Sequence, residues 1–202
     1  MVQKHDPKIA NSQLRLTIIA MVQVIGDKSS QEIVNGLDLG IDLIDLPPDN
    51  LEQTFPALNY AKLLAAVETT YGERGARILN RIGRATFHQV LREQPNWMSS
   101  ARRTMGIWKP ARRIELMLEA VIEAQRKTYP QNESWIENRN GRISIIEQNC
   151  VVCSGRVDSS PVCFIRIGFL SEAANWATDK EYNFVETACI ATGDPFCQFS
   201  ID

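Results

Sequence analysis

The sequence predicts an α+β domain in which helices and antiparallel strands form separate layers. From about residue 9 to residue 128, apolar residues recur at helical spacing. After Pro130 the pattern changes to short strand-like runs, two of which are joined by an Asn140-Gly141 turn. Helices followed by two hairpins with one helix between them are typical of segregated layers.

Length and composition support one domain, residues 1–202, with a helical part over about 9–128 and a hairpin, a helix and a second hairpin over about 133–202. The chain has 202 residues, of which 44% are hydrophobic, enough for one sizeable core. Lysine and arginine number 22 against 24 acidic residues. This balance gives no sign of a nucleic-acid partner.

Three helices are predicted in the first part of the chain. Asn11–Ile25 has apolar residues at helical spacing and stops at Gly26. Ser29 or Ser30 is expected to cap a short helix over residues 31–37. Residues 56–71 form the third, which ends at Gly72.

The next helix, residues 73–91, carries Gly75 and Gly83, which lower helix stability and therefore indicate close approach of a neighbour or a ligand. An adjacent face carries a row of arginines at spacings of three, four and three, namely Arg74, Arg77, Arg81 and Arg84. Such a row can bind carboxylates, although a solvated face is the commoner explanation. A further helix is predicted from Pro110 to just before Pro130.

Three thiols and a carboxylate near the carboxyl end form a candidate zinc site: Cys163, Glu186, Cys189 and Cys197. Ser160 as N-cap and Pro161 at the first helical position would place Cys163 in the first turn of a helix. A strand over residues 181–190 and a returning strand over 196–201 would bring Cys189 and Cys197 together.

The spacing leaves two other interpretations open. Glu186 and Cys189 are three residues apart and would point to opposite faces of a regular strand, so a bulge or a strand end is required. Cys150 and Cys153 form half of a zinc knuckle, which gives the alternative set Cys150, Cys153, Cys189 and Cys197. All of these could also be ordinary buried cysteines.

The run from Pro161 to Leu170, Trp176, and the run from Glu186 to Ile201 resemble the closing signature of the 4-vinyl-reductase-like domain family. The resemblance implies zinc binding by Cys163, Glu186, Cys189 and Cys197. Cys150 and Cys153 would then be spare thiols, packed near the site or labile to oxidation.

Earlier segments resemble the branch of this family grouped with bacteriochlorophyll-synthesis J-type proteins: residues 11–26, 46–50 and 71–83. That resemblance implies a bundle of helices on a twisted antiparallel sheet, as in subunits of the trafficking-protein-particle (TRAPP) tethering complex. It also implies a homodimer and a small hydrophobic ligand, in this branch a tetrapyrrole such as a chlorophyll precursor or a bilin.

The expected function is that of an accessory or carrier protein in pigment synthesis or photosystem assembly, peripheral to a photosynthetic membrane. Side chains expected near the ligand are Arg74, Arg77, Arg81, Trp97, Trp108 and Phe164.

The alternatives are a reductase of a vinyl group on a chlorophyll precursor, and a scaffold or sensor that acts through a partner. A reductase needs a hydride donor, and no G-x-G-x-x-G motif follows a predicted strand. No catalytic constellation can be assembled around His5 or His88. An enzyme is therefore the less favoured hypothesis.

The cysteines and the amino-terminal sequence predict the cellular compartment of the protein. The five cysteines follow a polar amino terminus without a secretory signal, and Leu16–Ile25 is too short an apolar run to cross a bilayer. We therefore expect reduced thiols in the cytoplasm, with attachment to a membrane surface open.

Overall fold

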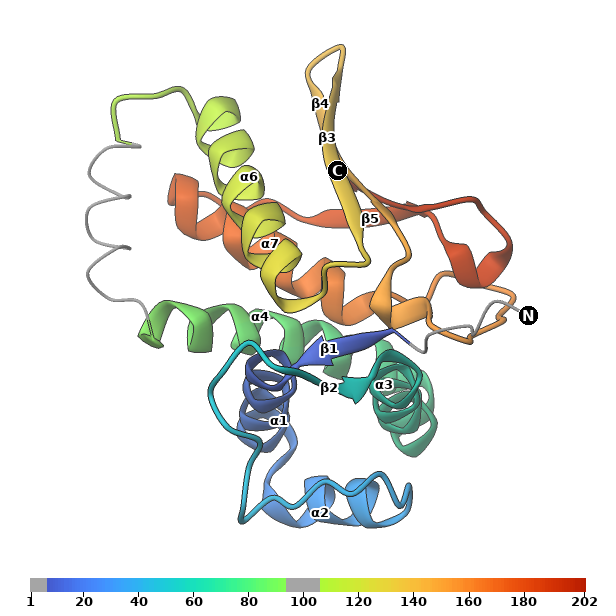
Figure 1. Ribbon diagram of the computed structural model, residues 1–202. Helices are drawn as coiled ribbons and strands as arrows, with labels where there is room; N and C mark the ends of the chain where they lie inside the picture. Colours follow the sequence, from blue (N-terminus) through green and yellow to red (C-terminus); the bar gives the residue numbers. More distant parts are fainter. Residues whose placement is uncertain (1–6, 94–105) are drawn as a thin grey trace.

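The computed structural model describes residues 7–93 and 106–202. Figure 1 shows the arrangement: α1, α2 and α3 lie at the bottom, α4 and α7 cross the middle, and a four-stranded sheet lies above them. The β3–β4 hairpin projects away from the body. The predicted α+β class, with helices packed on an antiparallel sheet, is confirmed.

The helices agree closely with the apolar periodicity. Their bounds are α1 Asn11–Ile25, α2 Asp27–Asn35, α3 Ala57–Tyr71, α4 Gly75–Glu93, α6 Pro110–Thr128 and α7 Phe164–Thr178, with 3₁₀ turns η1 Gly72–Arg74, η2 Val151–Cys153 and η3 Ile190–Thr192. Pro110 occupies the first position of α6, where the missing N–H costs nothing.

The main sheet joins the two predicted hairpins in the order β3-β4-β6-β5, with every neighbouring pair antiparallel. Its strands are β3 Glu133–Arg139, β4 Arg142–Gln148, β5 Phe184–Ala188 and β6 Cys197–Ile201. A small second sheet pairs β1 Lys8–Ala10 with β2 Gln53–Pro56. The predicted Asn140-Gly141 turn connects β3 to β4, with both residues at positive φ.

Helices α4 and α7 cross at a pair of glycines. A Cβ at Gly83 would clash with the carbonyl oxygen of Ile165, and a Cβ at Gly168 would clash with that of Asn80. Gly75 also approaches α3 closely, because a Cβ there would lie 2.6 Å from the Cα of Glu68. The prediction that Gly75 and Gly83 mark close approach is confirmed, and the approaching group is a neighbouring helix in both cases.

Two predicted helix starts are wrong. Helix α2 begins at Asp27, so Ser30 lies inside it and its hydroxyl donates to the carbonyl oxygen of Gly26 instead of capping the end. Helix α7 begins at Phe164, and Cys163 is its N-cap residue. Ser160 and Pro161 lie in the segment before that helix, and the carboxylate of Glu186 accepts the N–H of the N-cap residue Cys163.

No helix within residues 7–93 and 106–202 combines the length and the apolar character needed to cross a membrane.

Candidate metal centre

Four separate segments bring cysteines together beneath the final hairpin. Cys153 ends η2, Cys163 precedes α7, Cys189 follows β5, and Cys197 begins β6. All are buried, and none forms a disulfide. One ligand atom from each of them, together with a carboxylate oxygen of Glu186, lies within 4.8 Å of all the others. We call these five residues the thiol cluster.

Cys153 lies at the centre of the sulfur contacts. Its Sγ atom is 3.3 Å from that of Cys163, 3.6 Å from that of Cys189 and 3.4 Å from that of Cys197. The Sγ atoms of Cys163 and Cys197 are 3.9 Å apart. Cys150 touches the edge of the group, with its Sγ atom 3.8 Å from that of Cys163.

Glu186 reaches the cluster because β5 is irregular. The register between β5 and β6 shifts between Glu186 and Ala188, which is the bulge that the spacing of Glu186 and Cys189 required. Oε2 of Glu186 accepts the backbone N–H of Cys163 at 2.9 Å. Oε1 is buried and has no hydrogen-bond partner in the part of the chain that the structure describes.

The turn between β5 and β6 fixes the other two thiols. The N–H of Cys189 donates to a carboxylate oxygen of Asp194 at 2.8 Å, and the hydroxyl of Thr192 donates to the carbonyl oxygen of Cys189. The N–H of Ile190 points at the sulfur of Cys197, 3.4 Å away. Such N–H donors stabilise negative charge on sulfur.

Contacts among the thiols lower the pKa of some of them and raise the pKa of others. Hydrogen bonding with Cys153 lowers the pKa of Cys150 and Cys189, whereas hydrogen bonding with Cys150 raises the pKa of Cys153, Cys163 and Cys197. Burial raises the pKa of Glu186 to about 8, against the opposing hydrogen bond from the N–H of Cys163. A divalent cation among these groups would stabilise all the thiolates together.

The cluster fits a four-coordinate metal ion. Metal–sulfur bonds of about 2.3 Å put four sulfurs at the corners of a tetrahedron with edges of about 3.8 Å, close to the separations found here. The unpartnered oxygen of Glu186 is a further donor without another role. The residues predicted as zinc ligands, Cys163, Glu186, Cys189 and Cys197, are all present in the cluster.

Cys153 also belongs to the cluster, although the resemblance left it as a spare thiol. The alternative set is brought together only in part, because Cys150 lies outside the group of mutually close donors. The half-knuckle formed by Cys150 and Cys153 was the sequence signal for this additional donor.

A buried ion pair fixes α7 beside the cluster. The guanidinium of Arg166 donates to the carboxylate of Glu147, which is 1% exposed, and to the side-chain oxygen of Gln125. Burial raises the pKa of Glu147, and the charge of Arg166 opposes that shift. Glu147 pairs in register with Cys197, so this contact joins α6, α7 and the sheet next to the thiols.

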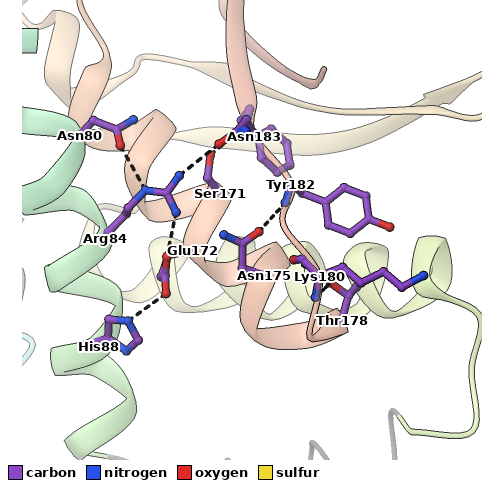
Figure 2. A network of polar contacts seen from close by, with 11 residues as sticks. Asn80, Arg84, His88, Ser171, Glu172, Asn175, Thr178, Lys180, Tyr182 and Asn183 are labelled. Atoms are coloured by element: carbon purple, nitrogen blue, oxygen red, sulfur yellow. Dashed lines mark hydrogen bonds and ion pairs between the residues drawn. The ribbon is translucent and has the colours of Figure 1, made fainter. Parts of the chain in front are cut away.

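None of the predicted ligand-binding arginines belongs to the thiol cluster. Arg74, Arg77 and Arg81 are exposed, and none forms an ion pair with another described residue. Arg84 is instead held by Glu172, Asn80 and Asn183, and His88 contacts the second oxygen of Glu172 (Figure 2). This network links α4 to α7 and to the segment before β5. Because Arg84 is engaged in it, Arg84 differs from the other arginines of the predicted row, which form no such ion pair with a described residue.

The predicted aromatic contacts are dispersed. Trp108 is 48% exposed just before α6, whereas Phe164 is partly buried against the core in the first turn of α7. Trp97 lies outside the described residues. Their assignment to a ligand site stays a prediction.

Two open hollows of about 360 Å³ each lie on the described surface. One, which we call the α6 hollow, lies between the start of α6 and the sheet and is lined by Ala111, Ile114, Gly141, Arg142, Ile143, Tyr182, Ile201 and Asp202. The other, the loop hollow, is lined mainly by α1 and residues 40–55. Of the side chains expected at the ligand, the five that the structure describes, Arg74, Arg77, Arg81, Trp108 and Phe164, line neither hollow.

Similar folds occur among H-NOX proteins. A Fe(II)NO-ligated H-NOX protein from S. oneidensis superposes with a TM-score of 0.62 at 11% identity, covering 93% of this chain and 98% of that one. A mutant Fe(II) H-NOX protein from K. algicida gives 0.60 at 12% identity, covering 93% and 94%. A third structure, described as modulating heme redox potential through porphyrin distortion, gives 0.60 at 11%, covering 96% and 98%. At these identities the likeness concerns the fold alone.

Sequence similarity to known proteins covers part of the chain. An uncharacterized protein of Methanocaldococcus jannaschii is 32% identical over 74 residues, which cover 32% of this chain and 46% of that protein. The chain therefore spans about half the length of this relative. Residues 143–202, which contain every residue of the thiol cluster, match the 4-vinyl-reductase domain model, in agreement with the resemblance found in the sequence.

Proposed function

We propose that this protein is a non-catalytic binding domain for a small apolar molecule of the tetrapyrrole class. The observation that carries the proposal is the α6 hollow, which has apolar walls and a few polar groups at its rim. Its volume is at the lower end of the range of about 300–1,000 Å³ typical of ligand pockets. A flat ligand would therefore insert one edge and leave the rest outside.

The polar rim suits a tetrapyrrole. Arg142 is exposed and forms no ion pair with any described residue, so its guanidinium is free to bind a propionate. Asp202 lines the same hollow and can accept a hydrogen bond from a pyrrole N–H. Ile201 is partly exposed in the hollow and offers apolar contact to the ring edge, over a floor that contains the buried Ile114 and Ile143.

The fold supports this ligand class, since the H-NOX structures with similar folds are described by their iron and heme chemistry. His88 does not line the α6 hollow, so it is not placed to ligate the iron of a tetrapyrrole bound there. Binding would rest on apolar contact and carboxylate pairing, and the ligand would be a chlorophyll precursor or a bilin.

The wider role that we propose is delivery of the pigment, as an accessory or carrier protein in pigment synthesis or photosystem assembly. The match to the 4-vinyl-reductase domain supports this assignment. We further propose a cytoplasmic homodimer that works beside a photosynthetic membrane.

We also propose that the thiol cluster binds one zinc ion. Zinc accepts thiolate and carboxylate donors in a tetrahedral shell, and a shell filled by protein ligands serves structure, since it leaves no position for substrate. The ion would fasten η2, the start of α7 and both strands of the final hairpin to one another.

The ligand proposal is tested by titrating the purified protein with chlorophyllide and with biliverdin, with and without NADPH, while reading the visible spectrum. We expect a shifted band that is independent of NADPH. Ala111→Trp, which fills the α6 hollow, should weaken binding at least about tenfold. Ile41→Trp in the loop hollow is the matched control and should leave affinity unchanged.

Two results would contradict the proposal. An NADPH-dependent loss of the vinyl chromophore would identify a reductase. An unshifted spectrum with both pigments, or equal effects of the two tryptophan variants, would exclude the α6 hollow as a tetrapyrrole site.

A further inference from the structure

We infer that Cys153, rather than Glu186, supplies the fourth metal ligand, so that the site is a four-thiolate centre. This inference rests on the metal binding proposed above. It differs from the ligand set implied by the resemblance, which contains only three thiols.

The sulfur positions carry the inference. The Sγ atom of Cys153 has nearly equal distances of 3.3, 3.6 and 3.4 Å to those of Cys163, Cys189 and Cys197. An atom equidistant from three others lies over the centre of their triangle, which is the apex of a tetrahedron. All four sulfurs lie within 4.8 Å of one another, so an ion bound about 2.3 Å from the three base sulfurs on that side would also lie near the sulfur of Cys153.

Glu186 has a different task in this arrangement. Its Oε2 atom accepts the N–H of Cys163, one of the donors that the start of α7 leaves without an intrahelical partner. A carboxylate there also interacts favourably with the positive end of the helix dipole. Glu186 therefore positions Cys163 and the first turn of α7, next to the metal but outside its shell.

The backbone is shaped to present Cys153. Residues 150–153 form a knuckle-like turn in which the N–H of Cys153 donates to the carbonyl oxygen of Cys150 at 3.2 Å. Arg156 follows, with its N–H bonded to the carbonyl oxygen of Cys153 and its guanidinium paired with Glu68 on α3. The turn is thereby fastened to the helical layer, and metal binding through Cys153 would connect that layer to the final hairpin.

The competing donor is the second oxygen of Glu186, which is buried without a partner among the described residues. X-ray absorption at the zinc edge of the wild-type protein distinguishes the two ligand sets. We expect four sulfurs at about 2.3 Å and no oxygen; three sulfurs and one oxygen at about 2.0 Å would overturn the inference. This measurement needs no variant and is independent of whether a variant folds.

Cobalt substitution in variants of the full chain adds a second readout. Removing one of four thiolates in Cys153→Ser should lower the thiolate-to-cobalt charge-transfer absorption per bound ion by about a quarter. Glu186→Gln should leave it unchanged, as should Cys150→Ser, the matched control three residues away in the same turn. A spectrum altered by Glu186→Gln and unaltered by Cys153→Ser would overturn the inference. A wild-type protein that binds neither ion would instead overturn the zinc proposal, so the two failures are distinguishable.

Discussion

The thiol cluster and the α6 hollow differ in how closely their residues are held together. In the cluster, donors from four chain segments converge within 4.8 Å, all its thiols are buried, and backbone N–H groups orient the carboxylate and a sulfur. In the α6 hollow, apolar walls and two charged rim residues surround an open space of about 360 Å³. The cluster is arranged to bind a metal ion that stabilises the fold, whereas the hollow is open to a ligand.

The difference indicates that metal binding and ligand binding would use separate parts of the protein. The cluster lies where η2, α7 and the final hairpin meet, so a bound ion would fix the part of the chain that matches the 4-vinyl-reductase domain. The hollow is lined by the first turns of α6, the β3–β4 turn, the end of β6 and Tyr182, which follows α7. Changes at the cluster should therefore alter folding, and changes at the hollow should alter binding alone.

The largest expected effect comes from losing a central thiol. Cys197→Ser should leave an insoluble or unfolded protein, because structural zinc contributes about 10–16 kcal/mol, comparable with the whole stability of a domain. Circular dichroism and size-exclusion chromatography report the loss. Cys150→Ser, at the edge of the cluster, should stay folded; equal behaviour of the two variants would show that the cysteines serve only as core residues.

An effect of intermediate size on stability is expected where α7 crosses α4, because that contact depends on helix packing and not on a metal ion. Gly168→Ala forces a methyl group onto the carbonyl oxygen of Asn80 and should lower the free energy of unfolding by about 3 kcal/mol. Chemical denaturation of the zinc-loaded protein measures it.

Gly36→Ala is the control, since Gly36 has helical φ and ψ and room for a methyl group. It should be neutral or slightly stabilising. A tolerated Gly168→Ala would mean that the two helices can move apart without cost.

The smallest effect is expected in the polar network of Figure 2. Arg84→Ala removes contacts to Glu172 and Asn183, but Arg84 is 30% exposed, so the loss should be about 1 kcal/mol and should shrink at high salt. Arg81→Ala, on the same helix without an ion pair to any described residue, should change stability by less than about 0.5 kcal/mol. Equal losses from both variants would show that the network contributes nothing specific.

Much of the fold follows from local patterns. The helical periodicity of residues 11–25 and the Pro110 start of α6 predict their elements correctly, because burial of one face dominates there. The two helix starts predicted from Ser30 and Ser160 are wrong, because α2 begins earlier, at Asp27, and α7 begins later, at Phe164. The N-cap residue of α7, Cys163, donates its N–H to the carboxylate of Glu186, 23 residues away in sequence, a contact that no local pattern indicates.

The candidate donors of the cluster were predictable from the sequence, whereas the inclusion of Cys153 was not. The spacing of Glu186 and Cys189 required a bulge, and the register shift in β5 supplies it. The inclusion of Cys153 depends on how η2 packs against α3 and on the Arg156–Glu68 pair, which are contacts between segments far apart in sequence. Local pattern therefore gives the candidate donors, whereas tertiary packing selects among them.

The most direct test of the central claim is the metal content of the purified wild-type protein, measured by elemental analysis together with thermal unfolding before and after chelation. Our account predicts about one zinc ion per chain and a large loss of thermal stability when the ion is removed. A metal-free protein that is fully folded, with all five thiols reduced, would contradict it.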